Sequence, residues 1–482
     1  MNKSLNKIFE VYVFAYAFFF ASRPINDGDF WFHLKTGEYI FQYGSIPRME
    51  LFSFTHYGRP WIAHGWLSGT IFYAIYSRLG FNSLIFIFAI LAALAFWIVY
   101  RRSDSHPFIG GFATLLGIVT VLPTIGVRPR VFTLLLASVF LALLTRYARR
   151  GEGRAIWWLV PLMTLWVNLH GGFLIGLALI ALTIIGIPLD AWVAGEKIRP
   201  LWPRLRTLGI VLLGGLLASL LNPYGIRIYT FVFGVLQSSV FQELISDWLS
   251  PNFHQSTSRP LLLLILLTIA AFGLSPKRVR PSDLLLFLAT LYATLKAQRN
   301  RAIFALVAVP LLADYSQNWL ASTRFGKLFG QTQSSGAARR LLLLSLILLL
   351  PLVASAVKLK STVYAPLKQE MAQVPLKAVE YLKERKITGN TFTHPNIWGG
   401  YLIWALPSNP VYIDGRDVYP EEFVKEYVDI TTGVTDWRGP FDRQGVRIVI
   451  VKPKSVLGRE LKDSPDWQQV FQDDMAVVFS RP

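Results

Sequence analysis

The sequence predicts a mostly α-helical, polytopic membrane protein with a small α/β domain at its C-terminus. Of its 482 residues, 53% are hydrophobic and only 16% are charged, whereas a soluble chain of this length carries about 25% charged residues. Apolar runs separated by turn residues recur up to residue 357, and from about residue 361 the composition becomes that of a soluble domain. We therefore expect a transmembrane helix bundle over 1–357 and an α/β domain over 361–482.

Eleven apolar runs are the predicted membrane spans. Several are shorter than the roughly 20 residues that a straight span needs, but their number and the turns between them favour bundled helices over a soluble core. The first run follows Lys3 and Lys7, yet no small-x-small cleavage site follows Phe20, so we interpret it as an uncleaved span. The runs lie at about 8–22, 82–100, 107–123, 131–146, 155–168, 172–193, 207–221, 259–274, 282–297, 302–315 and 341–357.

The distribution of charge predicts the orientation. Residues 1–357 hold 31 Lys and Arg against 13 Asp and Glu, while residues 358–482 hold 17 against 16. Basic loops favour the cytoplasmic side of the inner membrane. A further apolar segment, 61–76, disrupts this pattern if it spans the membrane and restores it if it lies in the interface, which its aromatic residues favour. The sequence then predicts eleven spans, a cytoplasmic N-terminus and an extracytoplasmic C-terminal domain.

Several classes of function lack support. A pI near 10 suits nucleic-acid binding, but no basic soluble face is visible, so no nucleic-acid partner is expected. The chain has no cysteine, which excludes disulfides and thiolate metal sites. It has no Walker A, H-E-x-x-H or G-x-S-x-G motif for nucleotide, zinc-protease or hydrolase chemistry. The absence of an internal repeat argues against an inverted-repeat transporter.

Two long outer loops and the C-terminal domain complete the predicted architecture. The first outer loop covers 23–76, and the second covers 222–258, which is rich in aromatic residues and expected to be partly helical at the interface. In the C-terminal domain we predict an amphipathic helix, two strands and a hairpin around Asp473-Asp474. These elements are Ala378–Lys386, Val411–Asp414, Arg447–Val451, and Gln469–Phe471 with Met475–Ser480.

With eleven spans, the polar residues near the helix ends all fall on the extracytoplasmic face. Ionisable groups at membrane depth are costly and usually line a cavity or pathway, so several from separate helices on one face predict a shared site. They are Asp27, Asp29 and His33 after the first span, Arg128 between the third and fourth, Asn168 and His170 between the fifth and sixth, Asn222 after the seventh and Arg299 after the ninth.

Asp27 and Asp29 are the candidate catalytic residues. A carboxylate in this turn can act as a general base on an acceptor hydroxyl or amine, or coordinate a divalent cation such as Mg or Mn. The alternative is the N-cap of a helix over Phe30–Phe41. His33 lies four residues after Asp29, on the same face of such a helix, where it orients the carboxylate, contacts a phosphate or packs.

Arg128 and Arg299 are the candidate phosphate ligands. They lie outside, against the positive-inside trend, where a lipid phosphate or pyrophosphate would accept bidentate hydrogen bonds from guanidinium. The alternative is a salt bridge to an aspartate of the first loop or to a headgroup. Asn168 and His170, followed by two glycines, line the site or form a structural turn.

Two further segments leave their roles open. Asn222-Pro-Tyr-Gly225 has the composition of a turn that ends a helix. In the C-terminal domain, Asp414 and Arg416 either pair across their Asp-Gly-Arg turn or face the membrane site.

At these residues the chain resembles a family of bacterial polytopic membrane proteins of the GT-C glycosyltransferase superfamily. The matching stretches run from residue 29 to 416, and their order and spacing carry the resemblance. They are Asp29-Phe-Trp-Phe-His-Leu-Lys-Thr-Gly37, Gly44-Ser-Ile-Pro47, Phe52-Ser-Phe-Thr55, Pro60-Trp61, Gly65-Trp-Leu67, Arg128-Pro129, Trp166-Val-Asn-Leu-His-Gly-Gly172, Asn222-Pro-Tyr-Gly225, Arg299-Asn300, Trp398-Gly-Gly-Tyr401 and Asp414-Gly-Arg416.

The superfamily includes oligosaccharyltransferase catalytic subunits, protein O-mannosyltransferases and aminoarabinose transferases, which place acidic residues early in a long first outer loop with interfacial helices. The resemblance implies that Asp29, and then Asp27, act as base or metal ligand, and that Arg128 or Arg299 holds a lipid phosphate. This sequence departs from the superfamily in lacking a recognisable acceptor-peptide motif.

The resulting expectation is a membrane glycosyltransferase that moves a sugar from a polyprenyl-phosphate-linked donor to an acceptor at the extracytoplasmic face. Its expected partners are membrane lipid and that donor, while the acceptor and any protein partner stay open. One alternative is a non-catalytic scaffold or accessory subunit that keeps the GT-C fold and binds a lipid or a protein partner. Another is a transporter of lipid or polysaccharide.

Overall fold

The computed structural model describes residues 3–25, 27–151, 153–323 and 374–481. Contacts divide the chain into two compact units, each described here by itself. The membrane unit comprises residues 1–23, 85–225 and 245–364, and the C-terminal unit comprises residues 24–84, 226–244 and 365–482. The predicted eleventh span, 341–357, and the predicted domain boundary at 357–361 lie outside the described residues.

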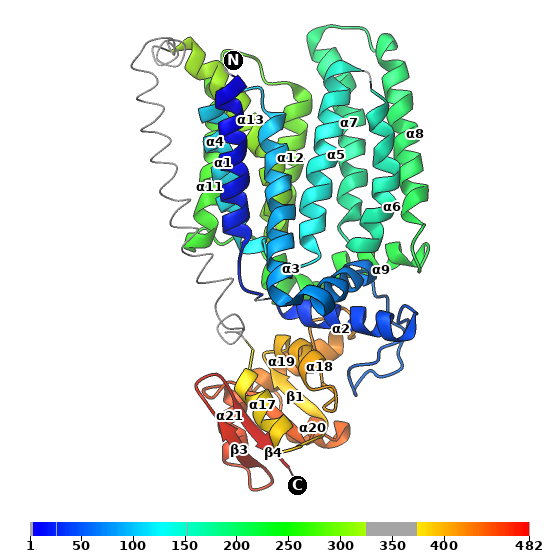
Figure 1. Ribbon diagram of the computed structural model, residues 1–482, viewed down its shortest axis with the longest axis vertical. Coiled ribbons are helices and arrows are strands. Elements are labelled where there is room, and N and C mark those ends of the chain that lie inside the picture. Colours follow the sequence, from blue (N-terminus) through cyan, green and yellow to red (C-terminus); the bar gives the residue numbers. More distant parts are fainter. Residues whose placement is uncertain (1–2, 26, 152, 324–373, 482) are drawn as a thin grey trace. The chain divides into compact units, whose positions relative to one another are not determined.

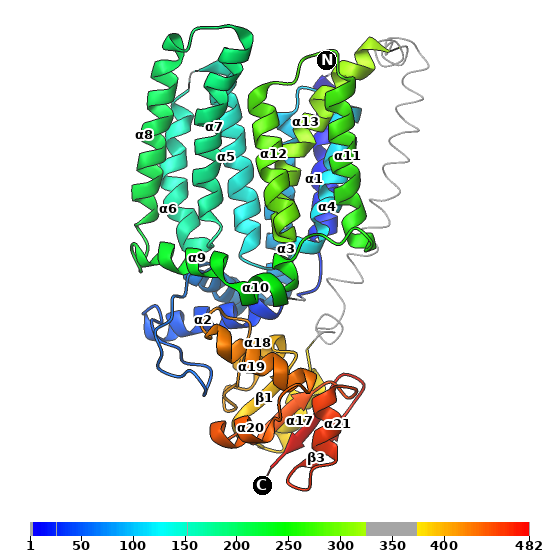
Figure 2. The same cartoon turned by 180° about the vertical axis from the view of Figure 1, so that it is seen from behind.

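The membrane unit is a bundle of helices that run side by side (Figures 1 and 2). Its helices coincide with ten of the eleven predicted runs. They are α1 (Lys3–Ala21), the second part of α3 (Trp66–Arg102), α4 (Pro107–Val121), α5 (Arg130–Arg150), α6 (Leu159–Leu169), α7 (Phe173–Ala194), α8 (Trp202–Ser219), α11 (Arg259–Leu274), α12 (Pro281–Lys296) and α13 (Arg301–Ser322). By length and composition, six of the described helices can cross a membrane, so the chain is a multi-pass membrane protein, as predicted.

Small residues let these helices approach closely. Gly117 of α4 lies against Val309 of α13, and Gly176 of α7 lies against Trp166 of α6 and Phe140 of α5, so that a Cβ at either glycine would overlap the neighbouring side chain. Packing of this kind is the main source of helix association where lipid surrounds the bundle, because apolar burial gives little advantage there.

Short 3-10 helices occupy several of the connections. They are η1 (Leu122–Thr124), η2 (Arg154–Trp158), η3 (Arg199–Leu201), η4 (Ser246–Trp248), η5 (Ser256–Ser258) and η6 (Gln298–Asn300). The predicted second outer loop, 222–258, is partly helical, as expected. It contains α9 (Arg227–Gln237) and α10 (Ser239–Leu244), which belong to the C-terminal unit, together with η4 and η5 of the membrane unit.

A glycine divides α3 into two helices. Gly80 has φ 77° and ψ −179°, which is not helical and which a residue with a Cβ rarely adopts. The 66–79 helix therefore precedes the 81–102 span as a separate element, a result consistent with the prediction for 61–76. Its position in the membrane interface stays a prediction.

The C-terminal unit joins the first loop to a small α/β domain. The loop contributes α2 (Gly28–Tyr43), which packs on the 66–79 helix where Gly37 meets Gly69. The domain contains α17 (Leu376–Glu384), α18 (Ile397–Ala405), α19 (Glu421–Thr432), α20 (Arg438–Gln444) and α21 (Val456–Lys462), and its strands are β1 (Thr391–His394), β2 (Ile448–Val451), β3 (Gln468–Gln472) and β4 (Val477–Ser480). The predicted helix, the second predicted strand and the hairpin are confirmed.

The sheet has the order β1-β2-β4-β3, with β1 parallel to β2 and the other pairs antiparallel. Its core is rich in buried aromatic residues, including Phe392, Trp437, Phe441 and Phe479. The predicted strand Val411–Asp414 is wrong, because only Val411 forms bridges, to Ser53 and Thr391. Beyond Val411, the chain turns so that Asp414 meets Arg416. The bridge to Ser53 attaches the first loop to the edge of the sheet.

Candidate functional site

The two candidate catalytic aspartates lie at the start of α2. Asp27 is the N-cap, and its Oδ1 accepts a hydrogen bond from the backbone N–H of Asp29 at 3.1 Å. This confirms the capping interpretation, in which the side chain satisfies an N–H that the first helical turn leaves without a partner. Asp29 follows in the first turn, and both residues are half-buried. Their roles as base or metal ligand stay predictions.

Backbone from the C-terminal domain packs directly against this turn. A Cβ at Gly400 of α18 would lie 2.6 Å from the carbonyl oxygen of Gly28, and a Cβ at Gly28 would lie 2.6 Å from Cβ of Ile397. Gly415 lies so close to Asp29 that a Cβ there would overlap Oδ1 of that carboxylate. Three glycines thus bring α18 and the Asp-Gly-Arg turn onto the start of α2.

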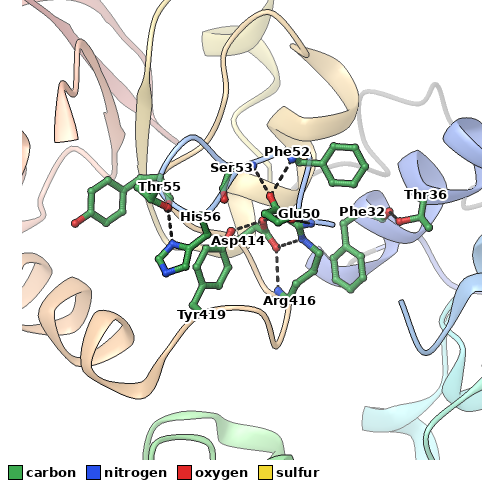
Figure 3. Close-up of polar contacts among 11 residues, drawn as sticks. Phe32, Thr36, Glu50, Phe52, Ser53, Thr55, His56, Asp414, Arg416 and Tyr419 are labelled. Carbon is green, nitrogen blue, oxygen red and sulfur yellow. Dashed lines mark hydrogen bonds and ion pairs between the residues drawn. The ribbon is translucent and has the colours of Figure 1, made fainter. Parts of the chain in front are cut away.

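The same turn contains a buried ion network (Figure 3). Nε of Arg416 donates to Oδ1 of Asp414 at 2.8 Å, and Nη2 donates to Oδ2 at 2.5 Å. Nη2 also donates to Oε1 of Glu50 at 2.9 Å, and Nη1 pairs with Oε2. The hydroxyl of Tyr419 donates to Oδ2 of Asp414 at 2.7 Å. The three charged side chains are at most 1% exposed.

This network confirms that Asp414 and Arg416 pair across the turn, and Arg416 also binds Glu50 of the first loop. Glu50 further accepts hydrogen bonds from the backbone N–H groups of Phe52 (2.8 Å) and Ser53 (2.5 Å). The Arg416 guanidinium lies over the rings of Phe52 (5.0 Å) and Trp61 (4.9 Å). Burial lowers the pKa of Arg416, but Asp414 and Glu50 outweigh it and hold that pKa well above its ordinary value.

His33 is buried on the side of α2 that packs against the 66–79 helix. Its ring lies against Gly65, where a Cβ would be 2.7 Å from Cε1, and its centroid is 6.1 Å from that of Phe72. Burial, and then the charge of His64, lower its pKa to about 3. The ring is therefore neutral at physiological pH, and any phosphate contact would rely on a neutral N–H rather than on a positive charge.

The candidate phosphate ligands belong to the membrane unit, where three guanidinium groups surround one carboxylate. Nη2 of Arg130 lies 2.8 Å from Oδ2 of Asp247, and Nη1 of Arg128 lies 3.9 Å from the same oxygen. The guanidinium of Arg299 lies 4.0 Å from the centroid of the Trp248 ring and acts electrostatically on Asp247. We call Arg128, Arg130, Arg299 and Asp247 the basic cluster.

Backbone contacts between η4 and η6 assemble this cluster. The N–H of Gln298 donates to the carbonyl of Leu249 at 2.9 Å, and its side-chain amide donates to the carbonyl of Ser246 at 2.5 Å. Arg301, which is 1% exposed, donates to the carbonyls of Gln298 (3.1 Å) and Thr257 (3.4 Å). These bonds hold Arg299 beside Trp248 and Asp247.

The basic cluster concentrates positive charge and is partly accessible to solvent. The side chains of Arg128, Arg130 and Asp247 are 20%, 19% and 37% exposed. Burial opposes ionisation of Asp247, but the three arginines outweigh it and lower its pKa. Three guanidinium groups close to one carboxylate concentrate positive charge, which suits an anionic ligand such as a phosphate. The sequence placed Arg130 beside Arg128 on the outer face without assigning it a role, and it had no signal for Asp247.

The other polar candidates of the membrane unit lie in turns held by hydrogen bonds. Nδ1 of His170 accepts from the N–H of Gly172 (3.1 Å) and lies 2.8 Å from Oγ1 of Thr133, which itself accepts from Nε1 of Trp166 (2.9 Å). The neutral ring therefore carries its proton on Nε2. Thr133 is on α5, three residues after Arg130, which ties His170 to the helix of the basic cluster.

Asn168 and Asn222 have structural partners. The Asn168 amide donates to the carbonyls of Leu221 (2.9 Å) and Thr164 (2.8 Å), and thereby links α6 to the end of α8. The Asn222 side chain accepts from the N–H of Tyr224 at 2.8 Å, as a turn that ends a helix requires. These bonds support the structural-turn interpretation of both segments, while the predicted site-lining role of Asn168 stays a prediction.

Within the described residues, no three His, Asp or Glu side chains converge as a metal-ligand set. Asp27 and Asp29 are two carboxylates one residue apart. Magnesium is commonly held by one or two carboxylates, with water and substrate phosphate completing its coordination. The pair would suit a divalent cation of that kind, which stays a prediction.

Comparisons with known proteins identify the fold. No protein-family model and no curated protein sequence matches the chain. The chain is similar in structure to the oligosaccharyltransferase of Archaeoglobus fulgidus, with a TM-score of 0.57 and 13% identity over 92% of this chain and 69% of that one. It is also similar to ArnT from Cupriavidus metallidurans bound to undecaprenyl phosphate, with a TM-score of 0.52 and 14% identity over 100% of this chain and 98% of that one. The chain therefore has the fold of the GT-C glycosyltransferase superfamily, as the sequence resemblance predicted.

Proposed function

We propose that the chain is a membrane glycosyltransferase that transfers a sugar from a polyprenyl-phosphate-linked donor to an acceptor at the extracytoplasmic face. The observation that carries this proposal is the basic cluster, in which three guanidinium groups surround Asp247 on a GT-C fold. The similar ArnT structure has undecaprenyl phosphate bound. That ligand has the chemistry that the cluster favours, an anionic phosphate on a hydrocarbon tail.

In this proposal the basic cluster binds the lipid phosphate, which is also the leaving group. Arginine binds phosphate oxygens through paired N–H groups. As the bond between the anomeric carbon and the phosphate oxygen breaks, the electron pair and its negative charge pass to the phosphate. Guanidinium groups already in place stabilise this charge more in the transition state than in the bound donor, which lowers the barrier.

Asp29 is the proposed base. Its carboxylate takes the proton of the acceptor hydroxyl or amine as the acceptor atom bonds to the anomeric carbon. Direct displacement of this kind inverts the configuration at that carbon. Asp27 is engaged as the N-cap through Oδ1, so it is the weaker candidate for the same role. A divalent cation held by Asp27 and Asp29 would supply positive charge to a bound substrate, and no step here depends on it.

The test uses a strain that lacks the wild-type gene. Asp29→Asn and Arg128→Ala, introduced separately and together, are each expected to lower the glycan or glycolipid product at least ~100-fold, because each removes a group that acts in the transition state. Arg149→Ala is the matched control, since Arg149 also pairs with aspartates in the membrane unit, at 2.9 Å to Asp104 and 3.5 Å to Asp314. Product profiles that stay unchanged in the double variant would overturn the assignment.

A further inference from the structure

We infer that the Asp414-Gly415-Arg416 turn positions the carboxylate of Asp29. The C-terminal domain would then contribute directly to the proposed catalytic site. This inference rests on the proposed role of Asp29 as the base. It gives Gly415, Arg416 and Glu50 a role in the reaction, separate from the proposed phosphate binding by the basic cluster. All of these residues lie in the C-terminal unit.

The contact that carries the inference is between Gly415 and the carboxylate itself. A Cβ at position 415 would overlap Oδ1 of Asp29 and would lie 3.6 Å from its Cγ. The backbone of Gly415 is not in the left-handed region, so glycine is not needed there for its conformational freedom. The space that a larger residue would fill is the space that the Asp29 carboxylate occupies.

The turn is fixed by the buried ion network. Arg416 holds Asp414 from one side of Gly415 through two hydrogen bonds of 2.8 and 2.5 Å. It also binds Glu50 of the first loop, whose Oε1 is bound by two backbone N–H groups. A buried charged network in which the members have partners is rigid, because losing any one contact leaves a charge without a partner.

A fixed turn beside a reacting carboxylate has a kinetic consequence. The Asp29 side chain ends at Gly415, so the turn limits the rotamers that the carboxylate can adopt. Holding a catalytic group in its reactive geometry contributes to rate, and a misplacement of about 1 Å can cost about 100-fold. The network therefore acts on the proposed reaction through Asp29 and has no need to contact the substrate.

The contact can be tested without any substrate, because the natural chain has no cysteine. In Asp29→Cys combined with Gly415→Cys, one thiol takes the place of Cγ of Asp29, which lies 3.6 Å from a Cβ at position 415. That is close enough for a disulfide, whose two Cβ atoms are about 3.5–4.5 Å apart. Mild oxidation of the purified full-length protein is expected to join them within minutes, detected by mass spectrometry of the linked peptides. Asp29→Cys with Gly439→Cys is the control, since a Cβ at Gly439 would meet only Nη1 of Arg443, at 3.4 Å. Equal linking in both pairs, or none in the first, would overturn the inference.

The kinetic arm uses Gly415→Ala. The overlapping atom is the far end of the Asp29 side chain, so the fold can accept the methyl group while the carboxylate must move. In membranes supplied with lipid-linked sugars extracted from the native strain, the maximal rate is expected to fall at least ~10-fold. The half-saturating donor concentration and the melting temperature are expected to stay within twofold and 2 °C of wild type, by an order-of-magnitude estimate. Gly439→Ala is expected to change none of these values.

The outcomes separate this inference from the proposed function. If Asp29→Asn leaves the rate unchanged, the proposed base is wrong, whatever Gly415→Ala does. If Asp29→Asn abolishes the reaction while Gly415→Ala retains the wild-type rate, the base stands and the positioning role fails. A fall in melting temperature that matches the fall in rate for Gly415→Ala would assign the turn to stability alone and would also overturn the inference.

Discussion

The two units use the same residue types in opposite ways. In the basic cluster of the membrane unit, three arginines face one carboxylate, and the paired side chains are 19% to 37% exposed. In the ion network of the C-terminal unit, one arginine lies between two carboxylates, and all three side chains are at most 1% exposed. In the first arrangement, arginines outnumber the carboxylate at a partly accessible position, whereas in the second the donors and acceptors are engaged in a closed interior.

This difference bears on the roles proposed for the basic cluster and for the ion network. A buried charge is tolerated only with partners, so the network around Arg416 ties the first loop to the C-terminal domain. An exposed ion pair contributes little to stability, since water screens it and its side chains lose conformational entropy. The basic cluster is the more accessible of the two arrangements and so is the one that suits the proposed binding of a lipid phosphate.

The largest expected effect is on stability, in the C-terminal unit. Arg416→Ala leaves Glu50 and Asp414 buried without their cation and is expected to cost about 3–5 kcal/mol of unfolding free energy. The measurement is the melting temperature of the purified protein in detergent. Arg438→Ala is the control, because its pair with Asp436 is 59% and 62% exposed, and it should cost less than about 1 kcal/mol. Equal melting temperatures for the two variants would mean that the buried network around Arg416 stabilises the fold no more than an exposed ion pair does.

A second expected effect concerns pH. Burial, and then the charge of Arg59, outweigh the opposing charge of Glu50 and lower the pKa of His56 to about 4, below its ordinary value of 6.5. The unfolded chain then binds this proton more readily than the folded one. His56 therefore has its full stabilising contribution above pH 6.5, and stability falls by about 1.4 kcal/mol per pH unit between pH 6.5 and 4.

His56→Phe isolates this contribution. The His56 ring lies 5.1 Å from the ring of Tyr419 and 4.6 Å from that of Phe423, so phenylalanine suits the site. Denaturation of the two proteins at pH 7 and pH 5 is expected to show a weaker loss of stability in the variant. An equal loss of stability from pH 7 to pH 5 in the two proteins would mean that the folded protein accepts the proton on His56.

The sequence predicted the bundle and most of the α/β domain well because both depend on local patterns. Apolar runs located ten helices of the membrane unit, and short apolar runs beside turn residues located β2 and the β3–β4 hairpin. The error at Val411–Asp414 arose because an apolar run before a turn has the same pattern as a strand. Its partner Ser53 lies more than 350 residues away, and no local signal predicts that pairing.

The candidate sites show the same limit. Arg128 and Arg299 were identified because arginine is less common in extracytoplasmic loops than in cytoplasmic ones. Asp247 and Trp248 lie in a loop whose composition suggested only an interfacial segment. Glu50 gave no signal, since its partner Arg416 belongs to a distant domain. Contacts between distant segments decide these sites, and a single sequence does not reveal them.

A smaller effect, of opposite sign, is expected from Asp247→Asn. Removing the one carboxylate of the basic cluster raises its positive charge, so a short-chain polyprenyl phosphate should bind about fivefold more tightly at low salt, or about 1 kcal/mol. Arg128→Ala and Arg299→Ala should weaken the same binding. Isothermal titration at two salt concentrations measures the change. Weaker binding in Asp247→Asn would mean that the carboxylate orients the arginines rather than competing with the ligand.

The smallest expected effect concerns Trp248. Its ring lies 4.0 Å from the Arg299 guanidinium, an interaction worth about 0.5–1 kcal/mol at a partly exposed site. Trp248→Leu should therefore weaken binding of the same lipid phosphate about two- to fivefold. Trp158→Leu is the control, because Trp158 is 65% exposed and lies outside the cluster. A change of equal size in the control would assign the effect to detergent or lipid contacts.

Release of the leaving group tests the proposed glycosyl transfer directly. Purified protein in lipid nanodiscs is supplied with lipid-linked sugars and acceptor material extracted from the native strain, and free polyprenyl phosphate is measured by mass spectrometry. We expect release by the wild-type protein and by Arg149→Ala, and loss of release in Arg128→Ala and in Asp29→Asn. Lipid that remains bound to the wild-type protein with no polyprenyl phosphate released would contradict the account and would favour a lipid-binding scaffold with the GT-C fold.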